Sequence, residues 1–99
     1  MASSKEYRDF ILEQLGLLDT ITCKSMMGEY LLYYNDLLFG GIYDDRLLVK
    51  IVSTNGKYHM QEQLPYEGAK NMYLVEDVEN RDLLKEIVLD TVEGLSKKK

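Results

Sequence analysis

Apolar positions near the start of the chain follow helical spacing. They recur at i, i+3 and i+4 over residues 3–18, which predicts an amphipathic helix. Ser3 or Ser4 can accept hydrogen bonds from the first free N–H groups, and Gly16 is expected to end or loosen the helix. The predicted buried face consists of Tyr7, Phe10, Ile11, Leu15 and Leu18.

The pattern becomes strand-like in the middle of the chain. A β-prone run at residues 20–23 comes first. Asn35-Asp36 and Asp44-Asp45 then separate segments rich in Tyr, Leu, Val and Ile, and both pairs suit tight turns because Asn and Asp tolerate positive φ. The prediction is a three-strand antiparallel meander over residues 29–35, 37–43 and 46–51.

Helical spacing returns near the end of the chain. Residues 52–71 are polar and contain glycine, which indicates a long connection with a short helical turn, and residues 72–75 predict a short strand. A closing helix is predicted to begin at Asp77 or Asn80 and to be ended by Gly94 and the lysine tail. Its predicted buried stripe consists of Leu84, Ile87, Val88, Thr91 and Leu95.

These elements predict an α+β fold of two layers. An antiparallel sheet, made of the three-strand meander plus edge strands, is combined with N- and C-terminal helices. The 99 residues are expected to form one domain over residues 1–95, followed by a disordered basic tail at 96–99. The proportions of hydrophobic (45%) and charged (29%) residues agree with a folded globular chain rather than a disordered one.

Two-residue turns fix which residues share a side of the meander. The side expected beneath the helices is mainly aliphatic and comprises Leu31, Tyr33, Leu38, Gly40, Ile42, Leu47, Val49 and Ile51. The other side is aromatic with a basic edge, and its candidate interface residues are Tyr30, Leu32, Tyr34, Phe39, Tyr43, Leu48, Arg46 and Lys50. Because an open apolar face needs a partner, we predict a homodimer formed through it. The alternative is that residues 52–71 fold back over this side with Tyr58, Met60 and Tyr66.

Charge and cysteine content narrow the choice of partner and compartment. The formal net charge of −5 argues against broad nucleic-acid binding, so we do not expect direct DNA binding. Cys23 is the single cysteine, which suits a reducing compartment. The sequence has no pattern of a signal peptide and no apolar run long enough to span a membrane, so we expect a cytoplasmic location.

Reactive side chains in the sequence do not form a recognisable catalytic set. His59 has no cysteine or second histidine nearby, and Cys23 is expected to be a small buried thiol. Gly40-Gly41 lacks the spacing of a phosphate-binding loop. The acids fall at turns and a helix start, where they have structural reasons to be: Asp44, Asp45, Glu76, Asp77 and Glu79. We therefore predict no catalytic residue, cofactor or metal site.

Three segments together resemble the TfoX N-terminal domain family. They are Lys24-Ser25-Met26-Met27-Gly28-Glu29-Tyr30, the stretch from Phe39-Gly40-Gly41 through Asp44 to Lys50, and Leu64-Pro65-Tyr66-Glu67-Gly68-Ala69-Lys70. Family members often have Arg where this chain has Lys24, and the change keeps the charge but loses the bidentate geometry. The residues that match the family motif are Lys24, Met27, Gly28, Tyr30, Gly40, Asp44 and Lys50.

The resemblance implies a two-layer α/β fold and a stand-alone regulatory or interaction module without catalysis. Longer members add a C-terminal DNA-associated domain and act in regulating natural competence. We therefore expect a non-enzymatic, homodimeric module with a regulatory protein partner of unknown identity. The alternative is binding of a small ligand or single-stranded nucleic acid on the aromatic side of the sheet, because aromatic rings stack on bases and nearby cations hold phosphate.

Overall fold

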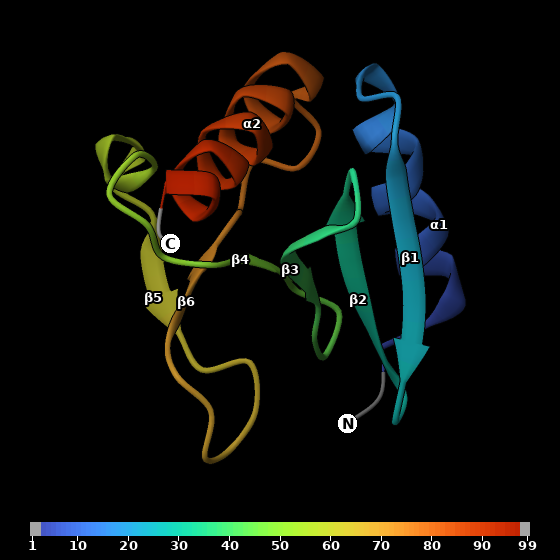
Figure 1. The fold of residues 1–99 in the computed structure, drawn as a ribbon. Helices are drawn as coiled ribbons and strands as arrows, with labels where there is room; N and C mark the ends of the chain where they lie inside the picture. Colours follow the sequence, from blue (N-terminus) through green and yellow to red (C-terminus); the bar gives the residue numbers. More distant parts are fainter. Residues whose placement is uncertain (1–2, 98–99) are drawn as a thin grey trace.

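The computed structural model describes residues 3–97, which form two α-helices and a six-stranded antiparallel sheet (Figure 1). The helical elements are α1 (Lys5–Gln14), η1 (Leu15–Leu17, 3-10), η2 (Gly56–Tyr58, 3-10) and α2 (Arg81–Lys97). The strands are β1 (Ile21–Met26), β2 (Glu29–Tyr34), β3 (Leu37–Ile42), β4 (Leu47–Val49), β5 (Gln61–Gln63) and β6 (Met72–Leu74). Their order in the sheet is β1-β2-β3-β4-β6-β5. This arrangement confirms the predicted α+β fold with a helix at each end.

The first helix is capped by Ser4, whose hydroxyl oxygen accepts a hydrogen bond from the Tyr7 N–H at 3.1 Å. Ser3 has a different role, because its hydroxyl donates to the Glu29 carboxylate at 2.7 Å and ties the helix start to the sheet. The α-helical hydrogen bonding gives way to the 3-10 turn η1 around Gly16, as the sequence predicted.

Both predicted hairpin turns are present. Asn35 and Asp36 have φ angles of 50° and 65°, and Asp44 and Asp45 have φ angles of 54° and 55°. Residues with positive φ at both turn positions match the right-handed twist of the flanking strands. A third such turn, at Met27 and Gly28, joins β1 to β2 and extends the β-prone run into a full strand.

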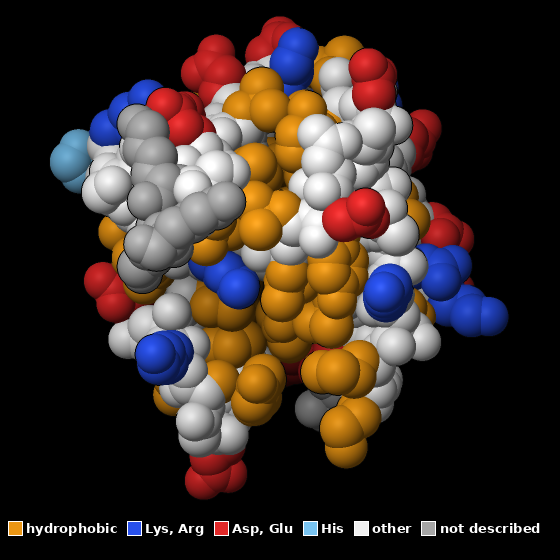
Figure 2. Space-filling model, viewed as in Figure 1, with side chains coloured by type: hydrophobic (Ala, Val, Ile, Leu, Met, Phe, Trp, Pro, Cys, Tyr) orange, Lys and Arg blue, Asp and Glu red, His pale blue; other side chains and the backbone are white. Residues whose placement is uncertain are grey.

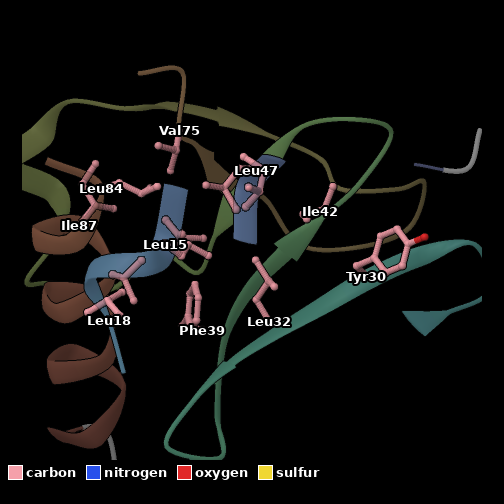
Figure 3. Packing of buried hydrophobic residues seen from close by; sticks show 13 residues of the cluster. Leu15, Leu18, Tyr30, Leu32, Phe39, Ile42, Leu47, Val75, Leu84 and Ile87 are labelled. Carbon is pink, nitrogen blue, oxygen red and sulfur yellow. The ribbon is translucent and has the colours of Figure 1, made fainter. Parts of the chain in front are cut away.

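A β-bulge in β3 decides which residues face the helices. The pairing of β2 with β3 shifts between Leu32↔Gly40 and Tyr33↔Leu38, so Phe39 is an extra residue in the ladder. Figure 3 shows the side chains of Leu32 and Phe39 pointing to the same side of the sheet. We call this side, which faces α1 and α2, the core side, and we call the opposite side the outer side.

The bulge makes part of the predicted side assignment wrong. The core cluster contains Tyr30, Leu32 and Phe39, which had been assigned to the open side. Conversely, Leu31, Tyr33 and Leu38 were expected beneath the helices but lie on the outer side, where Leu31 pairs with Gly41 and Tyr33 pairs with Leu38. The assignment of Ile42, Leu47 and Val49 is confirmed, since all three are fully buried in the cluster. Ile51 was expected on the same side, but it is only half-buried and lies outside this cluster. Sequence reasoning assumed regular pairing of the strands between the two turns. The extra residue reverses the side of the sheet on which each residue before it in the meander lies.

Gly40 allows neighbouring strands, rather than a helix, to approach closely. A Cβ atom at this position would lie 2.2 Å from the backbone oxygen of Leu48 in β4. Gly40 was expected on the side beneath the helices, but the atoms that a side chain at this position would meet first belong to the backbone of β4.

Helix α2 begins at the predicted Asn80, whose carboxamide oxygen accepts from the Leu83 N–H at 3.2 Å. Its predicted stripe is confirmed, with Leu84, Ile87, Val88 and Thr91 buried. The helix does not end at Gly94 but continues through Ser96 to Lys97. The residues expected to be a disordered tail are thus partly helical, and the last two, Lys98 and Lys99, lie outside the described residues.

The long connection after β4 is more ordered than the sequence indicated. It contains the short turn η2, as expected, and also the edge strand β5, which pairs with β6. Asn55 is fully buried within it and donates to the Lys50 carbonyl oxygen at 2.9 Å and to the Thr91 hydroxyl at 2.8 Å. The bond to Thr91 fastens the connection to α2. No helix among the described residues is long and apolar enough to cross a membrane.

Candidate protein-interaction groove

The predicted open aromatic face does not exist as one surface. Leu32 and Phe39 are 0% exposed, and Tyr30 and Tyr43 are also buried. Leu48 remains on the outer side, as predicted, yet it too is fully buried. A dimer interface that needs Leu32 and Phe39 at the surface is therefore ruled out by their position in the core.

Part of the outer side is covered by the chain's own connection. The Arg46 guanidinium donates to the Gln63 side-chain oxygen at 2.8 Å and to the Leu64 and Pro65 carbonyl oxygens at 3.2 and 3.3 Å. The ring of Tyr66 lies beside that of Tyr43, with centroids 6.0 Å apart. The alternative expectation, that residues 52–71 fold back over this side of the sheet, is confirmed for Tyr66. It is wrong for Tyr58 and Met60, which pack against the core cluster instead.

The connection leaves a groove of about 630 Å³ beside it on the outer side of the sheet. Figure 2 shows apolar side chains gathered in a strip over β2 and β3, with Lys or Arg side chains on either side. The groove is lined by Met26, Leu31, Leu38, Gly40, Tyr43, Lys50, Ile51, Pro65, Tyr66, Ala69, Lys70, Asn71, Met72 and Leu95. Most of this lining is apolar, so the groove has the character of a binding surface rather than of an ordinary solvent-exposed surface.

The charged residues of the groove are all positive among the described residues. Lys50 and Lys70 belong to its lining, which includes no Asp or Glu. Lys24 lies nearby on the same side, because it pairs with Leu31, and its ammonium group is 5.2 Å from the centre of the Tyr33 ring. A chain with a net charge of −5 thus concentrates positive charge around its apolar groove.

The family-motif residues divide into two groups in the structure. Gly28, Tyr30, Gly40 and Asp44 have structural positions: Gly28 is in a turn, Tyr30 is buried beneath the Arg8 guanidinium, Gly40 abuts β4, and the Asp44 N–H donates to Glu29. Lys24 and Lys50 instead lie on the outer side at or beside the groove, and Met27 projects from its turn with 96% of its surface exposed. The surface group is the one available to a partner.

The remaining reactive side chains lie apart from the groove. His59 is exposed, and no cluster of three or more His, Cys, Asp or Glu that could hold a metal occurs among residues 3–97. Cys23 is half-buried, and this burial raises the pKa of its thiol and so disfavours the reactive thiolate. Asp44 and Asp45 bind backbone and side-chain groups near the helix start, in the structural role that the sequence indicated.

One acid–phenol pair has perturbed titration. The Tyr58 hydroxyl donates to the Asp90 carboxylate, which also lies 3.1 Å from the Lys57 ammonium. Burial and this hydrogen bond raise the pKa of Tyr58 well above its usual range. The same hydrogen bond, followed by the Lys57 charge, lowers the pKa of Asp90. The pair joins the connection to α2 and leaves Tyr58 a poor proton donor.

Sequence reasoning missed the groove because it assigned the outer-side residues of β2 and β3 to the side beneath the helices. Leu31 and Leu38 had no signal of their own beyond alternation, and the bulge inverted that alternation. Lys70 could have been noticed only by its place in the segment 64–70, which resembled the family, since its approach to the sheet depends on the fold of the connection.

Comparison with known proteins gives two matches. Residues 13–94 match the family described as the TfoX N-terminal domain. An uncharacterised 12.7 kDa protein from the trpE 5' region of Spirochaeta aurantia is 30% identical over 80 residues, which cover 79% of this chain and 70% of that protein. The family match includes every residue of the groove lining except Leu95.

Proposed function

Because the chain belongs to the TfoX N-terminal domain family, we propose that it is a regulatory module that acts by binding another protein and not by catalysis. The observation that supports this proposal is the groove, an apolar hollow of about 630 Å³ with lysines in its lining, to which α2 contributes Leu95. In the proposed setting the protein is cytoplasmic and serves the regulation of natural competence, as the family resemblance implies.

The occupant that fits the groove is an apolar segment of a partner protein with acidic residues beside its apolar ones. The floor supplied by Leu31, Leu38 and Ile51 favours aliphatic or aromatic side chains. Lys50 and Lys70 favour Asp or Glu at the edges of the segment, where charge complementarity sets orientation and speeds association. The acidic surface elsewhere on the chain disfavours the same segment, which adds specificity.

A second candidate occupant is single-stranded nucleic acid or a small anionic ligand. The observation that favours it is Lys24 above the Tyr33 ring, together with Tyr66, which is 57% exposed at the groove. Aromatic rings beside cations can stack bases and hold phosphate. The net charge of −5 opposes this binding at long range, so we rank it below a protein segment.

A random peptide library displayed on phage tests the proposal directly. We expect peptides selected on the wild-type protein to combine apolar residues with Asp or Glu, and to shift the amide resonances of β2, β3 and residues 64–72. Lys50→Glu and Lys70→Glu should each weaken binding of a selected peptide by about tenfold, since each replaces an attraction by a repulsion. Lys85→Glu is the matched control, because Lys85 is exposed on α2 away from the groove lining and gives the same change of net charge.

Two results would contradict the protein-segment proposal. One is selection of peptides that bind elsewhere, so that Lys50→Glu and Lys85→Glu weaken binding equally. The other is tighter binding of a labelled oligothymidylate than of any selected peptide at the same salt concentration. The second result would transfer the assignment to single-stranded nucleic acid.

A further inference from the structure

Strand β1 is an open edge of the sheet with few of the features that normally protect an edge. It is the first strand in the sheet order, so only one of its sides is paired, by β2. Its six residues contain no proline, and its register with β2 is unbroken. The opposite edge strand, β5, has only three residues. Natural sheets usually protect edges by short strands, bulges, prolines or charges, and β1 has a single lysine.

The backbone groups that point away from the sheet can be identified from the register. The Asn35 N–H donates to the Thr20 carbonyl oxygen at 3.2 Å, so residues 20 and 35 form a hydrogen-bonded pair. Bonding then alternates along the antiparallel ladder, which gives Thr22 and Lys24 the inward bonds to β2. The N–H and C=O groups of Ile21, Cys23 and Ser25 therefore point outward at the free edge.

We propose that a second copy of this chain pairs with β1 in antiparallel orientation, with the two-fold axis passing beside Cys23. In this register Cys23 faces Cys23 of the other copy, and Ile21 faces Ser25 in both directions. Each of these pairs uses outward groups only, so each exchanges both of its N–H···O bonds. The outward groups of β1 are thus complementary to themselves, as a two-fold interface requires.

Charge and side-chain position favour the same register. It places Lys24 opposite Thr22, whereas a register centred on Lys24 would set two lysines opposite each other and align inward-pointing groups. Thr22, Lys24 and Ser25 are exposed in the single chain, so no side chain has to leave the core. An interface made mainly of one strand edge is small, and we expect a dimer that forms in the micromolar range.

The dimer has a geometric consequence for the proposed function. A two-fold axis perpendicular to the sheet relates the two copies without turning either one over, so the outer sides of both copies face the same way. The grooves of both copies then open on the same face of one continuous sheet, separated by the paired β1 strands. A partner with two acidic, apolar segments could bind both, although the dimer itself does not depend on what the grooves bind.

Sedimentation velocity over a range of concentrations tests the dimer without any ligand. We expect wild type and Ser25→Ala to dimerise alike, and Ser25→Pro to dimerise about tenfold or more weakly, because proline removes one outward N–H donor per copy. Ser25 is exposed and its N–H points away from β2, so the proline leaves the internal ladder bonds in place. Circular dichroism checks that the variant is folded.

A pair of charge variants keeps the test decisive if Ser25→Pro fails to fold. Thr22→Glu places an acid opposite Lys24 of the other copy and should tighten the dimer several-fold, while Thr22→Lys should weaken it by a similar factor. A monomeric mass at all concentrations overturns the proposal. So does a dimer whose strength is unchanged, or changed in the same direction, by both Thr22 variants.

Discussion

The two sides of the sheet are built from similar residue types but are covered in different ways. On the core side, residues of α1, η1 and α2 pack against the strands, with Ile11, Leu84 and Val88 completely buried. Figure 3 shows Leu15 of η1 and Leu84 of α2 in this packing. On the outer side, the covering element is an irregular connection held by the hydrogen bonds of Arg46 and the ring of Tyr66. The comparison shows that apolar strand residues do not by themselves determine a core, since the same sheet uses one side for stability and leaves a groove on the other.

The sharpest test of this comparison uses two neighbouring residues. Phe39 is fully buried on the core side, and Phe39→Ala should lower the free energy of unfolding by about 3–5 kcal/mol through lost burial and a cavity. Leu38 is half-buried at the groove, and Leu38→Ala should cost only about 1 kcal/mol. Urea denaturation measures both. A larger loss for Leu38→Ala would mean that the two sides have been exchanged.

The second test addresses the place where α2 passes from the core towards the groove. A Cβ atom on Gly94 would lie 2.5 Å from the Thr54 hydroxyl oxygen and 2.6 Å from Val52 Cβ. Gly94→Ala should therefore lower the free energy of unfolding by about 1–3 kcal/mol, in spite of the better helix propensity of alanine.

The control for this test is Gly16→Ala, because a Cβ at Gly16 meets nothing within 4 Å. This substitution should be neutral or stabilising by up to about 1 kcal/mol. Relative to the wild type, the melting temperatures of the two variants should shift in opposite directions or by clearly different amounts. Equal shifts in melting temperature would show that α2 and residues 52–54 are not tightly packed.

The third test separates the stability of the two sides. Arg46→Ala should free residues 63–65 from the outer side, with a loss of about 1–2 kcal/mol, because charge-assisted bonds to partly exposed groups are worth that much. Hydrogen exchange should accelerate in residues 61–71 and stay unchanged in α2. Arg46→Lys should recover only part of the protection, since lysine lacks the planar fork. If hydrogen exchange instead accelerates equally across the chain, the coverings of the two sides of the sheet are not independent of each other.

The smallest expected effect concerns pH and the Tyr58–Asp90 pair. The raised pKa of Tyr58 stabilises the fold below the ordinary tyrosine pKa of about 10, and this contribution is lost as the pH rises beyond it. The lowered pKa of Asp90 stabilises the fold above the ordinary aspartate pKa of about 4 and is lost as the pH falls below it. Tyr58→Phe should flatten both limbs of a stability-versus-pH curve by at most about 1 kcal/mol, because the pair is partly screened by solvent.

Local signals in the sequence predicted most of the elements correctly. Ser4, Asn80 and the two Asn and Asp turns each act through bonds or φ angles within a few residues, so their positions could be read from the chain. The bulge at Phe39 could not, because it depends on how β2 and β3 pair across the turn. The strand β5 and the groove depend in turn on where the connection returns to the sheet, which involves contacts such as Arg46 with Pro65, nineteen residues along the chain.

The exposure of Met27 gives the protein a built-in chemical reference. The residue is 96% exposed at the tip of a turn, so mild peroxide should convert its thioether to the sulfoxide at a rate set by solvent alone. Its neighbour Met26 and the more distant Met72 both line the groove. Mass-spectrometric footprinting can therefore express oxidation of Met26 and Met72 relative to Met27 in one sample, and an occupied groove should slow the first two while leaving the third unchanged.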